Sequence, residues 1–349
     1  MEHGNRSFDK QIRSTLLNRE LLSFLEGLIG GVSVKDVITI GEAMIVFDPN
    51  TTGPMKFVGG FEKKIGGAEL NLALGCARLG LKTGYISRLG NDEFGKHILN
   101  FARGEGIDVS QVEFVDGYPT SLNFKEIMED GNTRTFYYRD KSPTLTLKAD
   151  DLNEEYFQQA KILHITGIYP AIAPDHLNVI YRAIRLAKQN GMKISFDPNI
   201  RLRMWSKEEA KRVLSEILPY VDILLAGDEE MEIIIGEKNP KNIIDHAKAL
   251  GISFVAIKQG EKGSVGYSNG ETVVSQPVKA TKVVDTVGAG DGFNAGVLYG
   301  ILHDWSLERT LHFANTIGSM VVSVKGDNEG LPYYEDVQAK LGEVERVER

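Results

Sequence analysis

Residues 193–260 read KISFDPNIRLRMWSKEEAKRVLSEILPYVDILLAGDEEMEIIIGEKNPKNIIDHAKALGISFVAIKQG. In this stretch three short apolar runs, at 193–196, 222–225 and 254–257, alternate with helical patterns at 208–218 and 240–250. Apolar runs that are separated by helices are typical of strands in a parallel sheet that helices cover on both faces. The stretch therefore predicts an α/β fold with a doubly wound, mostly parallel sheet.

The same alternation continues on both sides of this stretch. Further apolar runs lie at 36–40, 161–165 and 282–284, and a further helical pattern lies at 177–190. Small or polar residues close the runs, namely Gly41, Gly167, Asp197, Gly227, Gly260 and Asp285. In open α/β sheets the ligand binds beyond the carboxyl ends of the strands, so we expect these residues to surround one shared cleft.

The composition excludes several classes of protein. Among the 349 residues there is one cysteine, Cys76, so an internal disulfide and a multi-cysteine metal site are both ruled out. The 40 Lys and Arg residues are outnumbered by 48 Asp and Glu residues, giving a formal net charge of −8. This charge disfavours nucleic acid and anionic membranes as partners. We expect a cytoplasmic protein that holds any anionic ligand with a few Arg, Lys or backbone N–H groups.

Residues 1–33 are predicted to form a helical N-terminal extension. Apolar residues recur at helical spacing between Ile12 and Leu28. No apolar run reaches the roughly 18 residues that a membrane span needs, and the cleavage pattern of a signal peptide is missing. We expect the extension to be dispensable for the fold.

Residues 121–139 break the alternation of strands and helices. They predict two strands joined by a turn at 129–132, which is a hairpin. Thr135, Tyr137 and Arg139 fall on one face of the second strand because side chains alternate. An aromatic ring and a guanidinium on one face favour a lid over an anionic ligand, and a solvated edge strand is an equally good interpretation.

The segment Asp285-Thr-Val-Gly-Ala-Gly-Asp-Gly-Phe293 is the most informative motif. It predicts a strand ending at Asp285, a glycine-rich turn and a helix over 293–302. Gly288 and Gly290 allow several amides of a helix N-terminus to point at one anion. A carboxylate at Asp291 repels a merely bound phosphate. It is useful if it takes the proton of a hydroxyl that attacks a phosphoryl group in this anion hole.

Two other phosphate motifs are rejected. The dinucleotide fingerprint would need glycine where Phe293 stands. The segment 90–97 differs from a P-loop in ending with His97, which has no hydroxyl for Mg²⁺, and it carries Asp92 and Glu93 where phosphates should lie. We expect a loop that leads into a helix at 90–97.

Several further residues are candidates whose role the residues alone leave open. Gly66, Gly67 and Asn71 open a helix over 70–79, which suits either a small ligand or tight packing. Arg201 follows a buried strand and should lie at the ligand-binding edge of the sheet. His164 is expected in the core. Glu230 belongs to an acidic cluster that is either a solvated helix start or part of a site for hydrated Mg²⁺.

Gly66-Gly67 with Asn71, followed by the motif at 285–291, resembles the two signatures of the ribokinase-like (PfkB-type) carbohydrate kinases, and the similarity runs from about Val37 to Tyr334. The resemblance implies a ribokinase-like kinase domain over 34–340, with a small β lid contributed by about 48–64 and 118–140. It implies ATP-dependent phosphorylation, with Mg²⁺, of a primary alcohol on a sugar or nucleoside, and it leaves a K⁺ requirement open. By this carry-over Asp291 is the base, and Gly288, Ala289 and Gly290 form the anion hole. The residues implied at ATP, besides those three, are Asn199, Lys258, Gly260, Gly263 and Asn315.

The segments 136–139, 166–170, 197–201 with Trp205, and 326–330 resemble the branch of this family that acts on 2-keto-3-deoxygluconate. The substrate contacts that this implies are Gly67, Asn71, Tyr137, Arg139, Arg201, Asp291 and Asp327. Two arginines suit a planar carboxylate, which agrees with an acid sugar. In kinases of neutral sugars an Asp that binds vicinal hydroxyls stands where this chain has Val46, although a shifted Asp48 could replace it.

The function expected is transfer of phosphate from ATP to the 6-hydroxyl of 2-keto-3-deoxygluconate, giving the 6-phosphate and ADP. The alternatives are a fructokinase- or ribokinase-like kinase of a neutral sugar, and a non-catalytic sugar-acid-binding protein. The family element Asn-x-x-Glu is present here as Gly227-Asp-Glu-Glu230, so Glu230 alone is carried over as a metal residue. Self-association is expected from the family's lids. The gluconate and galactonate epimers are not distinguished.

Overall fold

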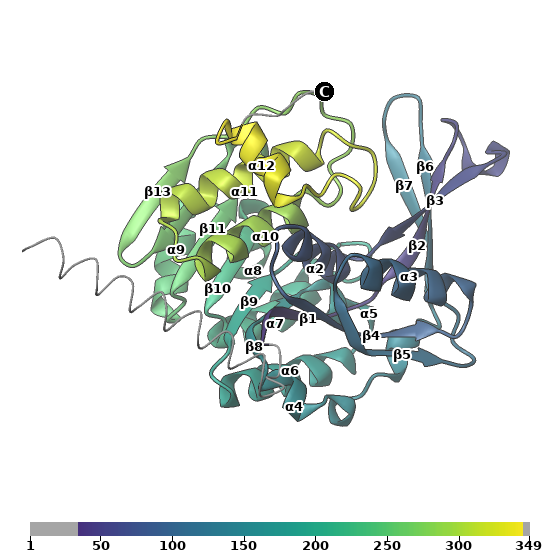
Figure 1. Ribbon diagram of the computed structural model, residues 1–349, viewed down its shortest axis with the longest axis horizontal. Helices are drawn as coiled ribbons and strands as arrows, with labels where there is room; N and C mark the ends of the chain where they lie inside the picture. The colour runs from purple at the N-terminus through teal and green to yellow at the C-terminus, as the bar shows by residue number, and fades with distance from the viewer. Residues whose placement is uncertain (1–33, 345–349) are drawn as a thin grey trace, which may run out of the picture. The chain divides into compact units, whose positions relative to one another are not determined.

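A computed structural model describes residues 34–344 of the chain. They form two sheets, and helices cover both faces of the larger one (Figure 1). The helical extension predicted at 1–33 lies outside the described residues. Within residues 34–344 there is no helix with the length and apolar character needed to cross a membrane.

The large sheet has nine strands in the order β13-β12-β11-β10-β9-β8-β1-β4-β5. Their bounds are β1 (Lys35–Ile40), β4 (Thr83–Gly90), β5 (Asp108–Val115), β8 (Ala160–Thr166), β9 (Lys193–Asp197), β10 (Ile223–Gly227), β11 (Phe254–Lys258), β12 (Ser264–Ser268) and β13 (Glu271–Ser275). Neighbouring strands from β5 to β11 run parallel, and β12 and β13 are antiparallel additions at one edge. The prediction of a doubly wound, mostly parallel sheet is confirmed.

Side chains alternate along these strands between two hydrophobic clusters. Leu224 and Ala226 of β10 pack into one cluster, and Ile223 and Leu225 pack into the other. The helices of the first cluster are α4 (Glu154–Phe157), α5 (Ile168–Ile172), α6 (His176–Gln189), α7 (Lys207–Ile217), α8 (Asp228–Ile235) and α9 (Pro240–Ala249). Those of the second are α2 (Ala68–Arg78), α3 (Glu93–Gly104), α10 (Ala289–Leu302), α11 (Leu307–Val321) and α12 (Tyr334–Leu341). Cys76 of α2 is fully buried in the second cluster.

A smaller sheet of four strands stands beside the large one (Figure 1). Its order is β3 (Phe61–Gly66), β2 (Met44–Pro49), β6 (Leu122–Ile127) and β7 (Thr133–Tyr138). One face carries stacked aromatic rings, with 4.6 Å between the ring centroids of Phe47 and Phe124. The hairpin predicted over 121–139 is confirmed as β6 and β7. The remaining segments are short 3-10 turns, η1 (Met55–Phe57), η2 (Pro143–Thr146), η3 (Ala149–Asp151), η4 (Leu218–Tyr220) and η5 (Gly260–Lys262).

The prediction of a strand at 282–284 is wrong. The segment lies in a loop between β13 and α10, where the Val284 amide donates to the Val322 carbonyl oxygen at 2.7 Å. No strand of the described part of the chain pairs with it, and Val283 is 62% exposed. A β-branched run with one hydrogen-bonded partner therefore stays a loop, and the turn that follows Asp285 is not attached to the sheet.

Candidate active site

The residue that caps helix α10 is a glycine that no other residue could replace without strain. Gly288 caps the helix with φ 78°, in the left-handed region, and an added Cβ would overlap the carbonyl oxygen of Asp327. The first amides of a helix have no acceptor within the helix, and its dipole favours a negative charge there. The start of α10 is therefore suited to binding an anion.

Asp291 lies in the first turn of this helix and is buried. Asn71 Nδ2 of α2 donates to Asp291 Oδ2 at 2.9 Å, so the two sequence motifs meet although they are 220 residues apart. Burial raises the pKa of Asp291 to about 7; Asp197 adds to this shift, while the Asn71 hydrogen bond, Arg201 and Lys258 oppose it. A carboxyl group that titrates near neutral pH is well matched to accept a proton from a hydroxyl.

The glycines before α2 allow a close approach of two chain segments. Gly67 caps α2 with φ 139°, and a Cβ there would overlap the carbonyl oxygen of Glu42. A Cβ at Gly66 would lie 2.6 Å from Asp327 Oδ2. These positions therefore need glycine, and they bring the residues around Asp327 to the start of α2.

The carboxyl ends of β9 and β11 carry a buried ion pair beside α10. Lys258 Nζ donates to Asp197 Oδ2 at 2.8 Å and to Asn294 Oδ1 at 3.4 Å, while Asn294 Nδ2 donates to Asp197 Oδ2 at 2.6 Å. Burial lowers the pKa of Lys258, but the carboxylates of Asp197 and Glu230 outweigh burial and raise it above its ordinary value. The lysine therefore stays charged beside the anion-binding turn.

Glu230, the predicted metal residue, uses its carboxylate to hold the backbone. Its Oε1 accepts from the Ile200 amide at 2.8 Å and its Oε2 accepts from the Gly227 amide at 2.7 Å. Burial, with Asp197 nearby, raises the pKa of Glu230. No group of three or more His, Cys, Asp or Glu side chains within residues 34–344 could hold a metal ion. The carboxylate of Glu230 could therefore reach a Mg²⁺ only through one of the waters that the ion keeps.

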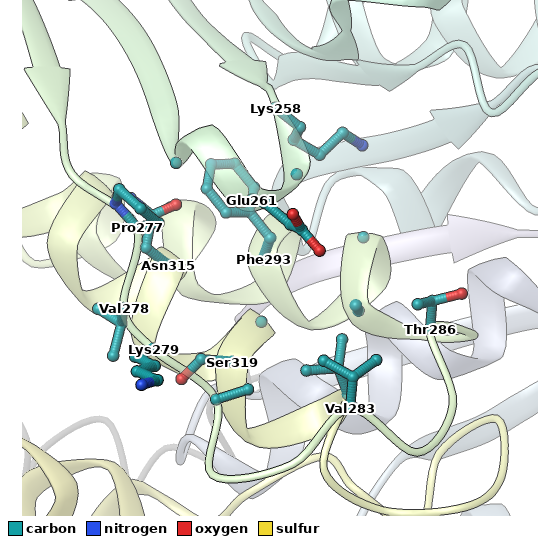
Figure 2. A pocket seen from close by; sticks show the side chains of 17 residues that line it. Lys258, Glu261, Pro277, Val278, Lys279, Val283, Thr286, Phe293, Asn315 and Ser319 are labelled. Atoms are coloured by element: carbon teal, nitrogen blue, oxygen red, sulfur yellow. The ribbon is translucent and has the colours of Figure 1, made fainter.

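A pocket of about 670 Å³ lies beside the start of α10. Of the residues expected at ATP it is lined by Lys258, Gly260, Gly263, Ala289, Gly290 and Asn315. Figure 2 shows Lys258 and Thr286 at one end, with Pro277, Val278 and Asn315 at the other. The apolar residues of the pocket suit a flat ring. The end of the pocket near Lys258 reaches the anion-binding amides at the start of α10.

Two residues expected at ATP are not among those that line this pocket, namely Asn199 and Gly288. Asn199 adopts φ 37°, and its amide donates to Asp197 Oδ1 at 3.1 Å. Asn315 lines the pocket, but its Nδ2 donates to Ser275 Oγ at 3.0 Å and so fixes the chain after β13. Residues of the loop 277–283, including Val278 and Val283, line the pocket and were not predicted from the sequence.

The arginine expected in the lid is held by a buried carboxylate. Arg139 follows β7, and its Nη2 lies 2.6 Å from Glu42 Oε2. Its guanidinium lies 5.3 Å from the ring centroid of Tyr137, in agreement with the prediction that the two share a face. Arg201 lies beyond β9, is exposed, and is close enough to influence the pKa of Asp291.

Two buried acids near the start of α2 were not predicted from the sequence, namely Glu42, between β1 and β2, and Glu69, in the first turn of α2. Glu42 accepts hydrogen bonds from Ser121 and Ser142 and pairs with Arg139. Burial raises the pKa of Glu69 to about 7, although a hydrogen bond from Thr166 acts in the opposite direction. The signals available were an acid next to the strand-ending glycine at 41 and an acid within the segment 66–71.

Asp327 lies beside the lid strands. Lys125 Nζ of β6 donates to its Oδ1 at 2.8 Å, and Asn328 Nδ2 donates to the Ile65 carbonyl oxygen at 2.7 Å. Asp48, the possible replacement for a hydroxyl-binding Asp, is buried and pairs with Lys64, Lys125 and Lys325 at 3.4–3.8 Å. Its carboxylate is therefore buried among three lysines, and neither of its oxygens accepts a hydrogen bond within the described residues.

Two interpretations of single segments are confirmed. Asp92 caps α3, its Oδ1 accepting from the Gly95 amide at 2.8 Å, so the segment 90–97 is a loop that leads into a helix. His164 is buried in β8 with Nδ1 2.9 Å from Ser195 Oγ, and burial lowers the pKa of His164 to about 4.

The geometry defines a class of protein: an α/β phosphotransferase in which a buried carboxylate stands at a helix N-terminus beside a nucleotide-sized pocket. Residues 34–333 match the model of the pfkB family carbohydrate kinases. The chain belongs to this family, so it is a carbohydrate kinase with a ribokinase-like fold.

The chain is also similar to individual proteins of known name. The 2-dehydro-3-deoxygluconokinase of Bacillus subtilis is 37% identical over 308 residues, covering 88% of this chain and 95% of that protein. The 5-dehydro-2-deoxygluconokinase of Geobacillus thermodenitrificans is 32% identical, covering 87% of this chain and 92% of that protein. Among solved structures, a putative Ribokinase II from E. coli in complex with ATP and Mg²⁺ has a TM-score of 0.82 and 26% identity, covering 89% and 100% of the two chains.

Proposed function

We propose that this protein transfers the γ-phosphoryl group of ATP to the 6-hydroxyl of 2-keto-3-deoxygluconate, giving 2-keto-3-deoxy-6-phosphogluconate and ADP. The observation that carries the proposal is Asp291, a buried carboxyl with a pKa raised to about 7, which Asn71 holds at the helix start that adjoins the pocket. The Bacillus subtilis relative is named 2-dehydro-3-deoxygluconokinase, a kinase of this sugar acid, and so supports the choice of substrate.

In the proposed reaction Asp291 takes the proton of the 6-hydroxyl as its oxygen forms a bond to the γ-phosphorus. The bond from this phosphorus to the bridging oxygen of ADP breaks, and ADP leaves with the electron pair. The amides of Gly288, Ala289 and Gly290 stabilise the charge on the transferred group, because they are fixed donors at a helix N-terminus. Magnesium would neutralise phosphate charge, and Glu230 would contact it only through water.

The nucleotide is proposed to occupy the pocket of about 670 Å³, with its phosphates toward Gly290. Lys258 supplies a fixed positive charge near the phosphates, because its ammonium is anchored on Asp197. Gly260 and Gly263 let the turn after β11 approach the ligand closely. Asn315 acts by holding the loop that begins at Ser275, and Asn199 acts from outside the pocket through Asp197.

The sugar acid is proposed to lie between the small sheet and the start of α2, with the small sheet acting as a lid. Arg139 and Arg201 would bind its carboxylate, with Tyr137 stacked beside Arg139. Gly67 and Asn71 would contact the sugar near Asp291, and Asp327 would accept a hydrogen bond from a hydroxyl. Val46 stands at the position whose acid binds neutral-sugar hydroxyls in related kinases, and the nearby carboxylate of Asp48 is buried and neutralised by lysines.

A coupled ADP-release assay with Mg²⁺ and ATP tests the proposal. The acceptors are 2-keto-3-deoxygluconate, its galactonate epimer, 5-dehydro-2-deoxygluconate, fructose and ribose. Selective turnover of 2-keto-3-deoxygluconate supports it, whereas preference for a neutral sugar or for the 5-keto acid overturns the substrate. Binding without ADP formation would identify a sugar-acid-binding protein instead. Replacing K⁺ by Na⁺ in the same assay tests whether K⁺ is needed.

Substitutions of Arg139 and Arg201 test whether these arginines bind the carboxylate of the sugar acid. Arg139→Ala and Arg201→Ala should each raise KM for the sugar acid by about 10–100-fold, the usual cost of losing a hydrogen bond to a charged group, and leave KM for ATP unchanged. Arg134→Ala is the matched control, because this arginine of β7 is exposed and its side chain is 71% accessible. An equal effect of all three changes would contradict the assignment.

The location and assembly of the protein are part of the proposal. We expect it to act in the cytoplasm, where ATP is available, and to self-associate. Fractionation of cells and sedimentation of the purified protein test these two statements.

A further inference from the structure

Strand β6 carries a buried lysine that the proposed mechanism does not use. The side chain of Lys125 is 8% exposed, and its ammonium faces three carboxylates. Its Nζ lies 2.8 Å from Asp327 Oδ1, 3.4 Å from Asp48 Oδ1 and 3.9 Å from Asp285 Oδ2. These acids come from the loop before α12, from β2 and from the loop before α10, so one side chain joins the small sheet to both loops of the site.

Asp327 is the carboxylate that links this cluster to the sugar site. Its carbonyl oxygen packs against Gly288, the cap of α10, and its Oδ2 lies next to Gly66 before α2. The neighbouring Asn328 donates to the Ile65 carbonyl oxygen at 2.7 Å and to Asn71 Oδ1 at 3.4 Å. Asn71 in turn holds Asp291. Asp327 therefore lies at the end of the site where the sugar is proposed to bind, with Lys125 directly behind it.

The charges around Asp327 compete with one another. Burial raises the pKa of Asp327, Asp48 and Asp285 raise it further, and the contact with Lys125 opposes this shift. Burial would lower the pKa of Lys125, but the same three carboxylates outweigh burial and raise it. The charged groups that face this pair are Asp48 of β2, Glu62 and Lys64 of β3, Asp285, Lys325 and Glu329. Among the described residues, Lys125 alone of these cations pairs with Asp327.

We propose that Lys125 is a positioning residue of the sugar site, whose ammonium keeps Asp327 ionised and oriented to accept a hydrogen bond from a sugar hydroxyl. The proposal rests on the proposed function in one respect, the placement of Asp327 against the sugar. A lysine that merely pins the small sheet would also shift the pKa of Asp327, but sugar binding would not follow the titration of that carboxyl. The two roles differ in how sugar binding depends on pH.

The first experiment measures ionisation directly and needs no sugar. Aspartate carboxyl carbons are labelled with ¹³C, and Asp327 is assigned from the signal that Asp327→Asn removes. Lys125→Met should raise the pH at which Asp327 titrates, because it leaves three clustered carboxylates without their shared cation. Asp48→Asn should lower it, because one of the competing negative charges is gone. An Asp327 titration that Lys125→Met leaves unchanged overturns the proposal.

The second experiment measures sugar binding by calorimetry in the Asp291→Asn background, where Asp291 cannot titrate. Lys125→Met should weaken binding of the sugar acid by about 10–100-fold near pH 6, the range expected for loss of a hydrogen bond to an ionised group. As the pH is lowered, binding should also be lost at a higher pH than in the parent protein. Binding of an ATP analogue should not change, and Lys125→Arg should restore sugar binding.

Lys64→Met is the matched control. Lys64 is a lysine of the same sheet, its side chain is 6% exposed, and it lies 3.8 Å from Asp48, yet it makes no ion pair with Asp327 among residues 34–344. Equal effects of Lys64→Met and Lys125→Met on sugar binding would show a general lid effect and overturn the proposal. If Lys125→Met does not fold, the test rests on two other variants. Lys125→Arg should leave the pH at which Asp327 titrates unchanged, and Asp48→Asn should lower that pH.

Failure of the proposed function is seen separately, in the wild-type ADP-release assay. The sugar used for calorimetry is the one that the wild-type protein phosphorylates. If that sugar is not 2-keto-3-deoxygluconate, the substrate is corrected while the Lys125 test proceeds with the new sugar. The carboxyl titration measures whether Lys125 sets the ionisation of Asp327 even when no sugar is phosphorylated.

Discussion

Asp291 is the residue on which the proposed chemistry depends most directly. Asp291→Asn should lower kcat by about 10²–10⁴-fold, the usual contribution of a general base, because an amide cannot take the hydroxyl proton. The amide oxygen can still accept the hydrogen bond from Asn71, so the fold and KM should change little. Steady-state kinetics and circular dichroism of the folded variant check this. Turnover close to the wild-type rate would show that Asp291 is not the base.

The raised pKa of Asp291 predicts two opposite pH effects. Activity needs the ionised form, so kcat/KM should be lost as the pH falls through about 7. Stability has the other sign, because a carboxyl whose pKa is higher in the folded state favours folding when protonated. This contribution is present below the unfolded pKa near 3.8 and is lost as the pH rises through about 7. Asp291→Asn should therefore raise the melting temperature relative to wild type at pH 8 and less so at pH 5.

At this scale the sequence predicted the residues whose role is local. Gly288, Gly290 and Asp291 are close in the chain, and the structure places them at one helix N-terminus as expected, although the helix begins at Ala289, four residues before the predicted start. Glu42 and Lys125 were missed because their partners come from distant segments. Lys125 and Asp327 are 202 residues apart, and no local pattern shows that they meet.

At the scale of elements, the two glycine caps limit which chain can form the site. Gly67→Ala and Gly288→Ala should each lower stability by at least about 1–3 kcal/mol, because both residues have positive φ and a Cβ would overlap a backbone carbonyl. They should also lower kcat/KM, since the caps position Asn71 and the anion-binding amides. Chemical denaturation and kinetics of the purified variants measure both effects.

Gly104→Ala is the control for the glycine variants. Gly104 closes α3, and its added Cβ would meet no atom within 4 Å, so this change should leave activity unchanged and stability equal or slightly higher. Wild-type stability of Gly67→Ala or Gly288→Ala would mean that the backbone can shift at these positions.

Elements with strong periodicity were predicted well. The helical patterns at 177–190, 208–218 and 240–250 correspond to α6, α7 and α9 within one or two residues at each end. The run at 282–284 failed because β-branched residues favour extended chain but do not supply a neighbouring strand. The strands β12 and β13 were missed although their signal is local. Asn269-Gly270 joins them, and both residues have positive φ, which is typical of a two-residue hairpin turn.

For the whole molecule, the described residues 35–344 contain both faces of the large sheet and the complete candidate site. The match to the carbohydrate kinase family likewise begins at residue 34. Deletion of residues 1–33 should therefore leave kcat, both KM values and the melting temperature unchanged. Loss of activity, or a change in oligomeric state on sedimentation, would assign the N-terminal segment a role that we do not expect.

The class of the whole fold could be predicted, but its strand order could not. Alternating strands and helices require crossover connections, and these favour a parallel sheet covered on both faces. The same alternation is compatible with many orders. Strand β1 lies between β4 and β8, and the small sheet combines β2 and β3 with β6 and β7. These pairings are set by packing between segments that are far apart in sequence.

Cys76 gives this molecule a chemical reporter of its own opening. It is the one thiol of the chain, it lies in α2 five residues after Asn71, and it is fully buried, which raises the pKa of its thiol well above the ordinary value. A thiol reagent can modify it only when α2 separates from the core. Labelling followed by mass spectrometry should therefore be slow, and the sugar acid, which is proposed to contact Gly67 and Asn71, should slow it more than nucleotide alone.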